Sequence, residues 1–241
     1  MKMLIFAQRV SKEILRDPLT LVFGIGFPVA LLLLLSAIQA NIPVEMFEIE
    51  KITPGMTVFG LTFISLFAAV LVAKDRETAF LQRLYTTPLR AVDFIVGYGL
   101  PFVPIALAQS VVCYLVALIL GLPFGKNIFI ALLLIIPVSI FFIFFGILCG
   151  SIFSVKQASG ICGALFTNLT AWLSGIWFDL NLVGGAFQKV ADCLPFIHAV
   201  EMEKAALNGN FSAVDDCWVF AYIILIVVLA IICFLKQMKS N

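Results

Sequence analysis

The chain is poor in charged residues: Asp, Glu, Lys and Arg make up only 12% of its 241 residues, while 63% are hydrophobic. Average soluble domains carry about twice that share of charge. A soluble fold could not hide this much apolar side-chain surface, because a large part of any globule faces water. The composition excludes a soluble globular protein and predicts an integral membrane protein.

Several kinds of chemistry are also missing. His198 is the only histidine and no C-x-x-C pair exists, which excludes the usual zinc and redox motifs. The string nearest to a phosphate-binding loop, "GLPFGKN" at 121–127, has its glycines one residue too close and Asn127 in place of Ser or Thr. We therefore expect no catalytic residues, no metal site, no cofactor held by this chain, no enzyme activity of its own and no nucleic-acid partner.

Long hydrophobic runs dominate what is present. A helix needs about 20 apolar residues to cross a membrane, and six runs are that long. They predict an all-α integral membrane protein in which 1–241 is a single transmembrane domain with spans at about 19–39, 56–73, 91–120, 128–153, 158–178 and 218–235. Pro101, Pro104 and Pro137 fall in the two longest runs, where we expect bends.

The distribution of Lys and Arg predicts the orientation. If the N-terminus is cytoplasmic, eleven of the fifteen basic residues fall on inner segments: Lys2, Arg9, Lys12, Arg16, Lys74, Arg76, Arg83, Arg90, Lys156, Lys236 and Lys239. The other four fall on outer segments: Lys51, Lys126, Lys189 and Lys204. The positive-inside rule then predicts a multi-pass protein with both termini in the cytoplasm.

Residues 1–17 have the pattern of an amphipathic helix. Its apolar face would comprise Met3, Phe6, Ala7, Val10 and Ile14. Its polar side would carry Arg9, Lys12, Glu13 and Arg16. Such a helix lies in the membrane interface rather than crossing the bilayer. The alternative is a simple membrane anchor that needs no partner and whose basic residues only set the topology.

Residues 74–90, "KDRETAFLQRLYTTPLR", form an island of mixed charge between the second and third runs. An apolar stripe, acids near the start and Pro88 at the end predict a short cytoplasmic helix. The stripe consists of Phe80, Leu81, Leu84 and Tyr85, and the polar side offers Arg76, Glu77, Gln82 and Arg83. Because the chain shows no energy source of its own, this coupling segment is a candidate docking surface for another polypeptide.

The long outer segment, 179–217, is expected to contain one short helix. Pro195 suits its first turn and Gly209 suits its end, so we predict a helix that dips into the outer leaflet before the last span. An ordinary loop helix has the same spacing. Cys193 and Cys217 share this segment, and the sequence leaves open whether they form a disulfide.

Polar side chains within the runs are few and uncharged. Gln109, Asn168 and Thr170 could line a substrate path or could simply hydrogen-bond neighbouring helices. The spacing Gly146-x-x-x-Gly150 indicates close contact between two helices.

The stretch "KDRETAFLQRLYTTPLRAVDFIVGYGLPF" resembles the segment R-E-x-G-T-L-E-x-L-x-x-T-P-x-x-x-x-x-x-x-G-K of the type-2 ABC transporter permeases. The matching residues are Arg76, Glu77, Thr78, Leu81, Leu84, Thr87, Pro88 and Gly97. Thr78-Ala79, Gln82 and Tyr98 depart from the pattern. Residues 194–211 are similar to the outer segment of the same family, and the resemblance extends over essentially the whole chain.

The resemblance implies a permease subunit that pairs with a second permease subunit, identical or not, and docks on a separate cytosolic ABC ATPase, which binds the ATP and Mg. The pair would export a hydrophobic or amphipathic substrate (drug, antibiotic, peptide or lipid-like) across a prokaryotic plasma membrane. Docking and coupling would use the helix at 1–17 and the residues Arg76, Glu77, Leu81, Arg83, Leu84, Thr87 and Pro88. The alternatives are an ATP-independent secondary carrier and a non-transporting scaffold or immunity protein.

Overall fold

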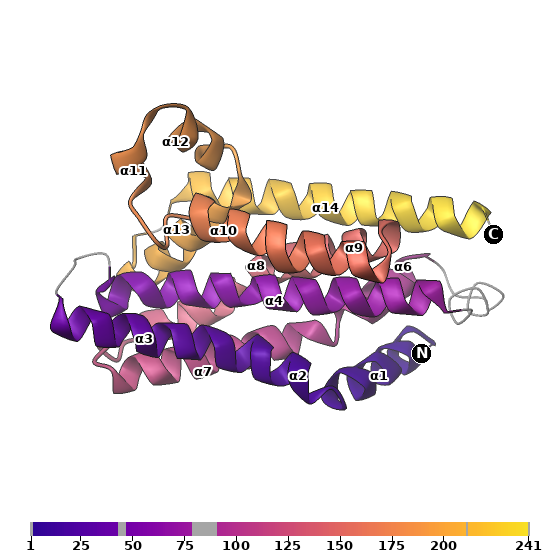
Figure 1. The fold of residues 1–241 in the computed structure, drawn as a ribbon, viewed down its shortest axis with the longest axis horizontal. Coiled ribbons are helices and arrows are strands. Elements are labelled where there is room, and N and C mark those ends of the chain that lie inside the picture. Colours follow the sequence, from indigo (N-terminus) through magenta and orange to yellow (C-terminus); the bar gives the residue numbers. More distant parts are fainter. Residues whose placement is uncertain (1, 43–46, 79–90, 211, 241) are drawn as a thin grey trace.

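In the computed structural model, the described residues are 2–42, 47–78, 91–210 and 212–240. Within these ranges the chain forms helices and no β-strand, and the long helices run side by side along one axis (Figure 1). The predicted all-α class is therefore confirmed.

The first half of the chain contains α1 (Lys2–Leu15), α2 (Pro18–Leu21), the π-helical turn η1 (Val22–Gly26), α3 (Phe27–Asn41) and α4 (Ile49–Glu77). The chain turns between α1 and α2 at Asp17, which caps α2: its carboxylate accepts the backbone N–H of Leu19 at 3.1 Å. Pro18 occupies the first position of α2, where its missing N–H costs nothing. Because α2, η1 and α3 follow one another directly, residues 18–41 form one long helical run.

The second half contains α6 (Ala91–Gly99), α7 (Phe102–Ile119), α8 (Asn127–Ile152), α9 (Val155–Ser159), η3 (Gly160–Phe166), α10 (Thr167–Leu173), α11 (Leu180–Val183), α12 (Gly185–Asp192), α13 (Pro195–Asn208) and α14 (Ala213–Ser240). The third predicted run is interrupted between α6 and α7, at Pro101, as a helix-breaking proline requires. Pro137 lies inside α8, which stays one helix.

Among the described residues, five helical stretches are long and apolar enough to cross a membrane: 18–41, 49–77, 92–119, 127–152 and 213–236. The chain is thus a multi-pass membrane protein. The run predicted at 158–178 corresponds to α9, η3 and α10, which together cover 155–173. Lys156, Gln157 and Asn168 dilute its hydropathy and it is not among the five, so the count of six spans stays a prediction.

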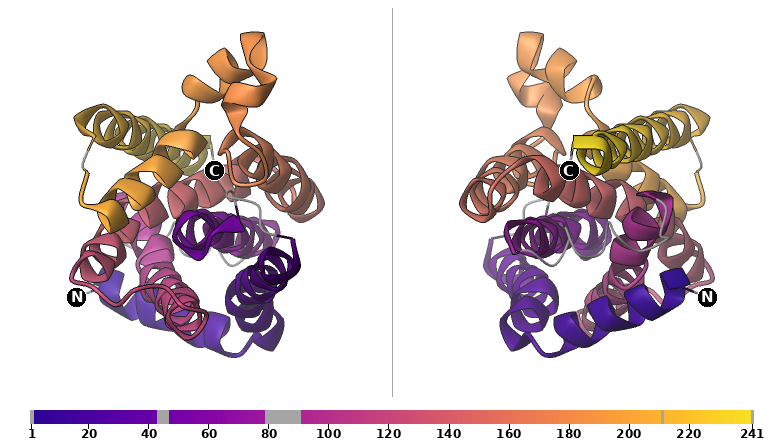
Figure 2. Two further views of the ribbon diagram at one scale, coloured as in Figure 1. Left: turned by 90° about the vertical axis from the view of Figure 1, so that its left-hand side faces the viewer. Right: turned by 90° about the vertical axis from the view of Figure 1, so that its right-hand side faces the viewer.

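α4 occupies the middle of the bundle, and the end-on views show other helices around it (Figure 2). Its closest neighbour is α8, because two glycines leave room for the backbone of α4. A Cβ atom on Gly146 would collide with the carbonyl oxygen of Ser65, and one on Gly150 with that of Ala69. The close helix contact predicted from the Gly-x-x-x-Gly spacing is confirmed.

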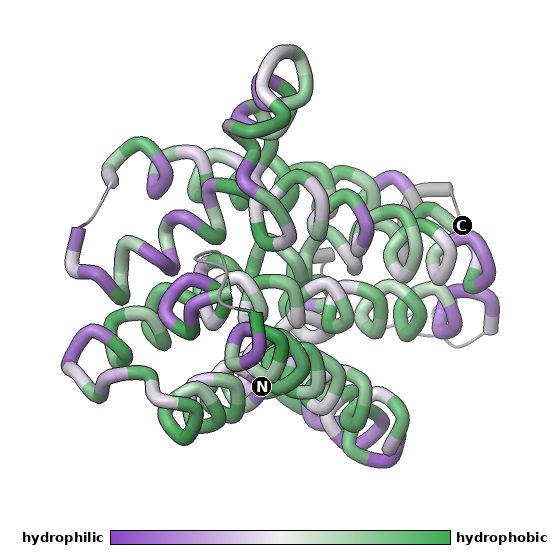
Figure 3. The backbone as a smooth tube through the Cα atoms, turned by 60° about the vertical axis from the view of Figure 1, so that its left-hand side comes forward, coloured by the Kyte–Doolittle hydropathy of each residue, from purple (hydrophilic) through white to green (hydrophobic). Residues whose placement is uncertain are grey.

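The two ends of the bundle differ. At one end lie α1, the last turns of α4 and α8, and both chain termini; we call this the inner end (Figure 1). At the opposite, outer end lie α11, α12 and the start of α14. Hydrophobic residues dominate the long helices, with hydrophilic residues mostly toward their ends (Figure 3). The charge rule predicts that the inner end is cytoplasmic.

Candidate functional site

The charged start of the predicted coupling segment belongs to α4. Residues 74–77 form the last turn of this helix, and Thr78 has an extended backbone that ends it. The structure therefore joins Arg76 and Glu77 directly to a span instead of placing them at the start of a separate helix. The remaining predicted coupling residues lie outside the described part of the chain: Leu81, Arg83, Leu84, Thr87 and Pro88.

Asp75 connects three helices at the inner end. It is only 4% exposed, and its carboxylate accepts hydrogen bonds from Arg9 Nη2 at 3.0 Å and from the Tyr98 hydroxyl at 2.8 Å. Arg9 lies on α1 and Tyr98 on α6. Burial opposes the charged form of Arg9, but the hydrogen bond and attraction of Asp75 outweigh that effect and raise the pKa of the guanidinium. The ion pair thus holds α1 to the end of α4, and the Tyr98 hydrogen bond holds α6 to the same place.

Arg76 and Glu77 hold the corner between α8 and α9. The Arg76 guanidinium donates to the carbonyl oxygens of Ser151 and Phe153, the latter at 2.6 Å. Glu77 Oε1 accepts the backbone N–H of Val155, the first residue of α9, at 2.8 Å. A cation thus meets the C-terminal end of one helix and an acid the N-terminal end of the next, which is the favourable arrangement for both helix dipoles.

We call Arg9, Asp75, Arg76, Glu77 and Tyr98 the inner junction. Through these side chains the last turn of α4 binds α1, α6 and the α8–α9 corner. The predicted docking residues Arg76 and Glu77 therefore have partners within the chain. Their contact with an ATPase remains a prediction.

The predicted amphipathic helix at 1–17 is observed as α1. Most of its predicted apolar face is buried: Phe6, Ala7, Val10 and Ile14. Gly97 allows α1 to approach α6, because a Cβ there would lie 2.5 Å from the Phe6 ring. Lys12 and Arg16 are exposed as expected, whereas Arg9 turns toward Asp75.

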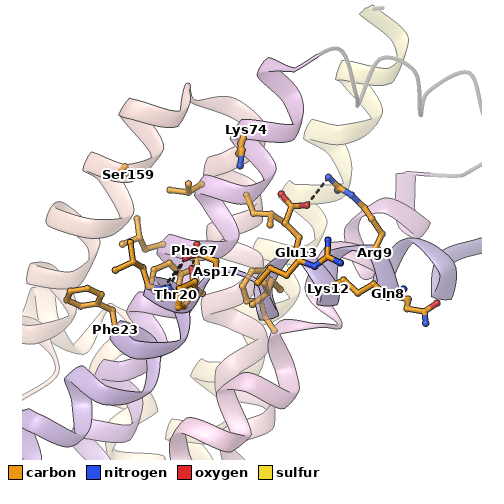
Figure 4. Close-up of a pocket in the computed structure, with 18 of the residues that line it drawn as sticks. Gln8, Arg9, Lys12, Glu13, Asp17, Thr20, Phe23, Phe67, Lys74 and Ser159 are labelled. Atoms are coloured by element: carbon orange, nitrogen blue, oxygen red, sulfur yellow. Dashed lines mark hydrogen bonds and ion pairs between the residues drawn. The ribbon is translucent and has the colours of Figure 1, made fainter.

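A cavity of about 1070 Å³ opens beside the inner junction (Figure 4). Its walls come mainly from α1, α2, η1 and the inner half of α4, with single side chains from α7 and α9. Charged side chains of α1 and Lys74 of α4 line one part of it, and Phe23 and Phe67 line another. It is therefore an amphipathic pocket at the level of the inner end.

The structure does not bring the three candidate path residues together. Gln109 is fully buried in α7, and its Nε2 lies 3.4 Å from the carbonyl oxygen of Thr57 on α4. Thr170 is fully buried in α10, whereas Asn168 is exposed and donates to Ala164 of its own helix at 2.7 Å. Gln109 thus contacts a neighbouring helix, and a role in a substrate path stays a prediction for all three residues.

Glu203 is a residue that the sequence gave no reason to single out. It lies on α13, is fully buried, and accepts a hydrogen bond from the Tyr114 hydroxyl of α7 at 3.2 Å. Its second oxygen has no partner among the described residues. Burial raises the pKa of Glu203 well above its ordinary value, and the Tyr114 hydrogen bond only partly opposes this. A helix expected in an outer loop thus inserts an acid between the spans.

His198 was also missed, because a single histidine in an outer segment carries no signal. It is 8% exposed, with Nδ1 2.7 Å from an Asp215 carboxylate oxygen and Nε2 2.9 Å from the Asp192 carbonyl oxygen. Its ring stacks on Trp218 at 5.3 Å. These contacts join α12, α13 and α14. α13 itself has the predicted bounds, with Pro195 first and Gly209 left-handed at φ +72° after its end. Cys193 and Cys217 are free thiols.

Comparison with known proteins adds two findings. The ABC-2 type transporter family matches residues 1–207. The chain is also similar to a protein of Porphyra purpurea named "Putative transport permease ycf38", with 29% identity over 143 residues, which are 55% of this chain and 49% of that protein. The chain thus spans about half the length of this relative.

The family match covers α1, the inner junction, four of the five membrane-spanning stretches and nearly all of α13. It agrees with the multi-pass helical bundle that the structure shows. The chain belongs to the ABC-2 type transporter family.

Proposed function

We propose that this chain is the membrane-spanning permease subunit of an ATP-driven exporter, working with a second permease subunit and a separate cytosolic ATPase that binds ATP and Mg. Its cargo would be a hydrophobic or amphipathic molecule that leaves the leaflet at the inner end. The family membership supports an ATPase partner, because the chain has no nucleotide-binding motif of its own.

The inner junction is the observation that carries this proposal. The last turn of α4 is the start of the predicted coupling segment and is bound to α1, α6 and the α8–α9 corner. A displacement imposed on residues 79–90 would therefore reach several helices at once through short polar contacts. Such a rigid corner suits a subunit that receives mechanical work from a partner and rocks between two arrangements.

The test is reconstitution with the ATPase that co-purifies with the chain. Replacing Glu77 and Arg83 together by alanine should strongly reduce both transport and the stimulation of ATP hydrolysis, while membrane insertion stays intact. The matched control replaces Glu50 and Lys51, one acid and one base at the opposite end of α4. Coupled activity that is unchanged in the Glu77/Arg83 variant would contradict the proposal.

A secondary carrier is the second candidate, and Glu203 is the observation that favours it. A buried acid between membrane helices is typical of proton-coupled transport. The two candidates respond to opposite treatments in intact cells. Export by the ATP-driven permease would stop when ATP is depleted, whereas export by a carrier would stop when an ionophore collapses the ion gradient.

A further inference from the structure

The cavity beside α1 combines a cationic rim with an apolar wall. Its charged lining residues are Arg9, Lys12, Glu13, Arg16, Asp17 and Lys74. Its apolar lining includes Phe23 of η1 and Leu66, Phe67, Val70 and Leu71 of α4. A ligand that fills the cavity must therefore have a polar or charged part for the rim and an apolar part for the wall.

The two acidic side chains of the rim already have partners within the chain. Glu13 pairs with Arg9 at 2.8 Å, and the Asp17 carboxylate caps α2 and accepts the Thr20 hydroxyl at 2.8 Å. Lys12, Arg16 and Lys74 are exposed and form no ion pair within 4 Å among the residues that the structure describes, although Asp17 attracts Lys74 from a longer distance. Three cations at one edge of the cavity are thus available to an anion.

The apolar wall runs along the axis of α4, as the acyl chain of a membrane lipid would. Lys74 and Leu66 are eight residues apart on α4, which corresponds to roughly 12 Å along the helix axis. Figure 4 shows Lys74 near the inner end of α4, Phe67 further along this helix and Phe23 on the far side of the cavity. The cations therefore lie at the depth of lipid head groups, and the apolar wall extends from them toward the bilayer centre.

We propose that this cavity binds an anionic phospholipid of the inner-end leaflet, with the phosphate among Lys12, Arg16 and Lys74 and an acyl chain against Phe23, Phe67 and Leu71. At about 1070 Å³ the cavity is slightly larger than the common range for ligand pockets, about 300–1,000 Å³, so it has room for a head group and part of a chain. A free anion would leave the wall empty, and a zwitterionic lipid would leave the three cations without a net counter-charge.

A lipid bound in this way would connect α1 to α4 beside the Arg9–Asp75 contact. Arg9 is held by Asp75 on α4, while Lys12 and Arg16 line the cavity that Lys74 also lines. The lipid would thus fix the interfacial helix against the central span. This binding is independent of transport and does not rest on the proposed function.

The experiment measures lipid binding to the purified full-length chain in neutral detergent by native mass spectrometry. Phosphatidylglycerol and phosphatidylcholine with identical acyl chains are compared. We expect phosphatidylglycerol to bind about tenfold more tightly or better, since each basic residue at a membrane surface adds attraction for an anionic lipid. Lys12→Gln combined with Lys74→Gln should reduce this preference to within about twofold.

The matched control is Lys126→Gln combined with Lys189→Gln, which removes two exposed lysines outside the cavity. It should keep the full preference. Equal binding of the two lipids, or a preference that survives in the Lys12/Lys74 variant, would overturn the proposal. So would displacement of the lipid by glycerol phosphate at equal concentration, which would indicate a plain anion site, or tighter binding of oleate, which would indicate a single-chain amphiphile.

Discussion

Asp75 is the residue on which the inner junction depends, since it is buried and accepts from both Arg9 and Tyr98. Replacing Asp75 by alanine would remove the buried acceptor that these two donors share. We expect the variant to lose about 2 kcal/mol in the free energy of unfolding, the usual contribution of hydrogen bonds to a charged group. The measurement is unfolding of the purified chain in detergent.

Glu13 provides the control for this prediction, because it binds the same arginine. The Arg9–Glu13 pair spans one turn of α1, and both side chains are about one-third exposed, 35% and 31%. Such pairs contribute about 0.5 kcal/mol. A loss in Glu13→Ala as large as that in Asp75→Ala would show that Asp75 has no special role.

Glu203 predicts a specific dependence of stability on pH. Its pKa is raised by burial, so the folded chain keeps the proton above the ordinary value of 4.5, where the unfolded chain releases it. The folded state then binds more protons, and stability must fall as the pH rises above that value. Glu203→Gln, which is neutral at every pH, should flatten this decline at pH values above 4.5 in thermal unfolding.

Glu201→Gln on the same helix is the matched variant, because the Glu201 side chain is 45% exposed and pairs with Lys204. It should keep the pH dependence of the original chain. If stability falls with pH at the same slope in the original chain and in Glu203→Gln, the buried Glu203 carboxyl is not the cause of this pH dependence.

Sequence reasoning reached some of these residues and missed others. Arg76 and Glu77 were found because charge is rare in this chain and the two belong to an ordered motif. The roles of Asp75, Glu203 and His198 were not, because each depends on a partner distant in the sequence: Glu203 and Tyr114, for example, are separated by 89 positions. Local patterns identify which residues are unusual, and only packing shows what they bind.

The contact between α4 and α8 leads to a prediction about helix packing. Gly146→Ala would place a methyl group against the Ser65 carbonyl oxygen, which belongs to the backbone and cannot turn aside. We expect the two helices to separate and the free energy of unfolding to fall by about 1–3 kcal/mol, as in other overpacked interiors. Thermal unfolding in detergent measures this loss.

Gly160→Ala tests whether the effect comes from the contact or from loss of a glycine as such. Apart from the adjacent residues and the backbone of its own helix, no atom of the described residues lies within 4 Å of the position that a Cβ of Gly160 would take. This variant should therefore be neutral or slightly more stable, because alanine favours a helix over glycine by about 1 kcal/mol. Similar losses in both variants would exclude close packing as the cause.

The helices themselves were largely predictable, because hydrophobicity and helix signals are local. The buried face of α1 matches its periodicity, and Pro195 and Gly209 mark the bounds of α13. The end of α4 was harder to locate: the charges at 74–77 suggested a new helix, yet they continue the span to Glu77. Contacts with α1, α6 and α8 stabilise these charged turns, and no local pattern contains that information.

The orientation of the whole molecule can be tested with its own cysteines. Cys193 and Cys217 are exposed and belong to the predicted outer segment, whereas Cys113, Cys149 and Cys162 are buried. A membrane-impermeant maleimide should therefore label intact cells through these two thiols, and Cys193→Ser with Cys217→Ser should abolish the signal. In that background, Lys12→Cys should react only after the cells are permeabilised. Labelling of Lys12→Cys in intact cells would reverse the orientation.

For the whole molecule, the sequence predicted the fold class and the family, but it did not predict how the helices pack. The composition was enough to predict a multi-pass helical protein, and one ordered motif was enough to indicate the family. The central position of α4 and the insertion of α13 against α8 and α14 follow from side-chain fit across the bundle. Such fit involves residues far apart in the chain, so a periodic pattern does not reveal it.

The close contact between α4 and α8 at Gly146 and Gly150 also restricts how this bundle can change shape. Where backbones touch without intervening side chains, sliding by even part of a turn would drive a carbonyl oxygen into a neighbouring Cα. α4 and α8 must then move together as one rigid body. Any rearrangement that opens the protein would have to occur at its other helix boundaries, with this pair as the fixed reference.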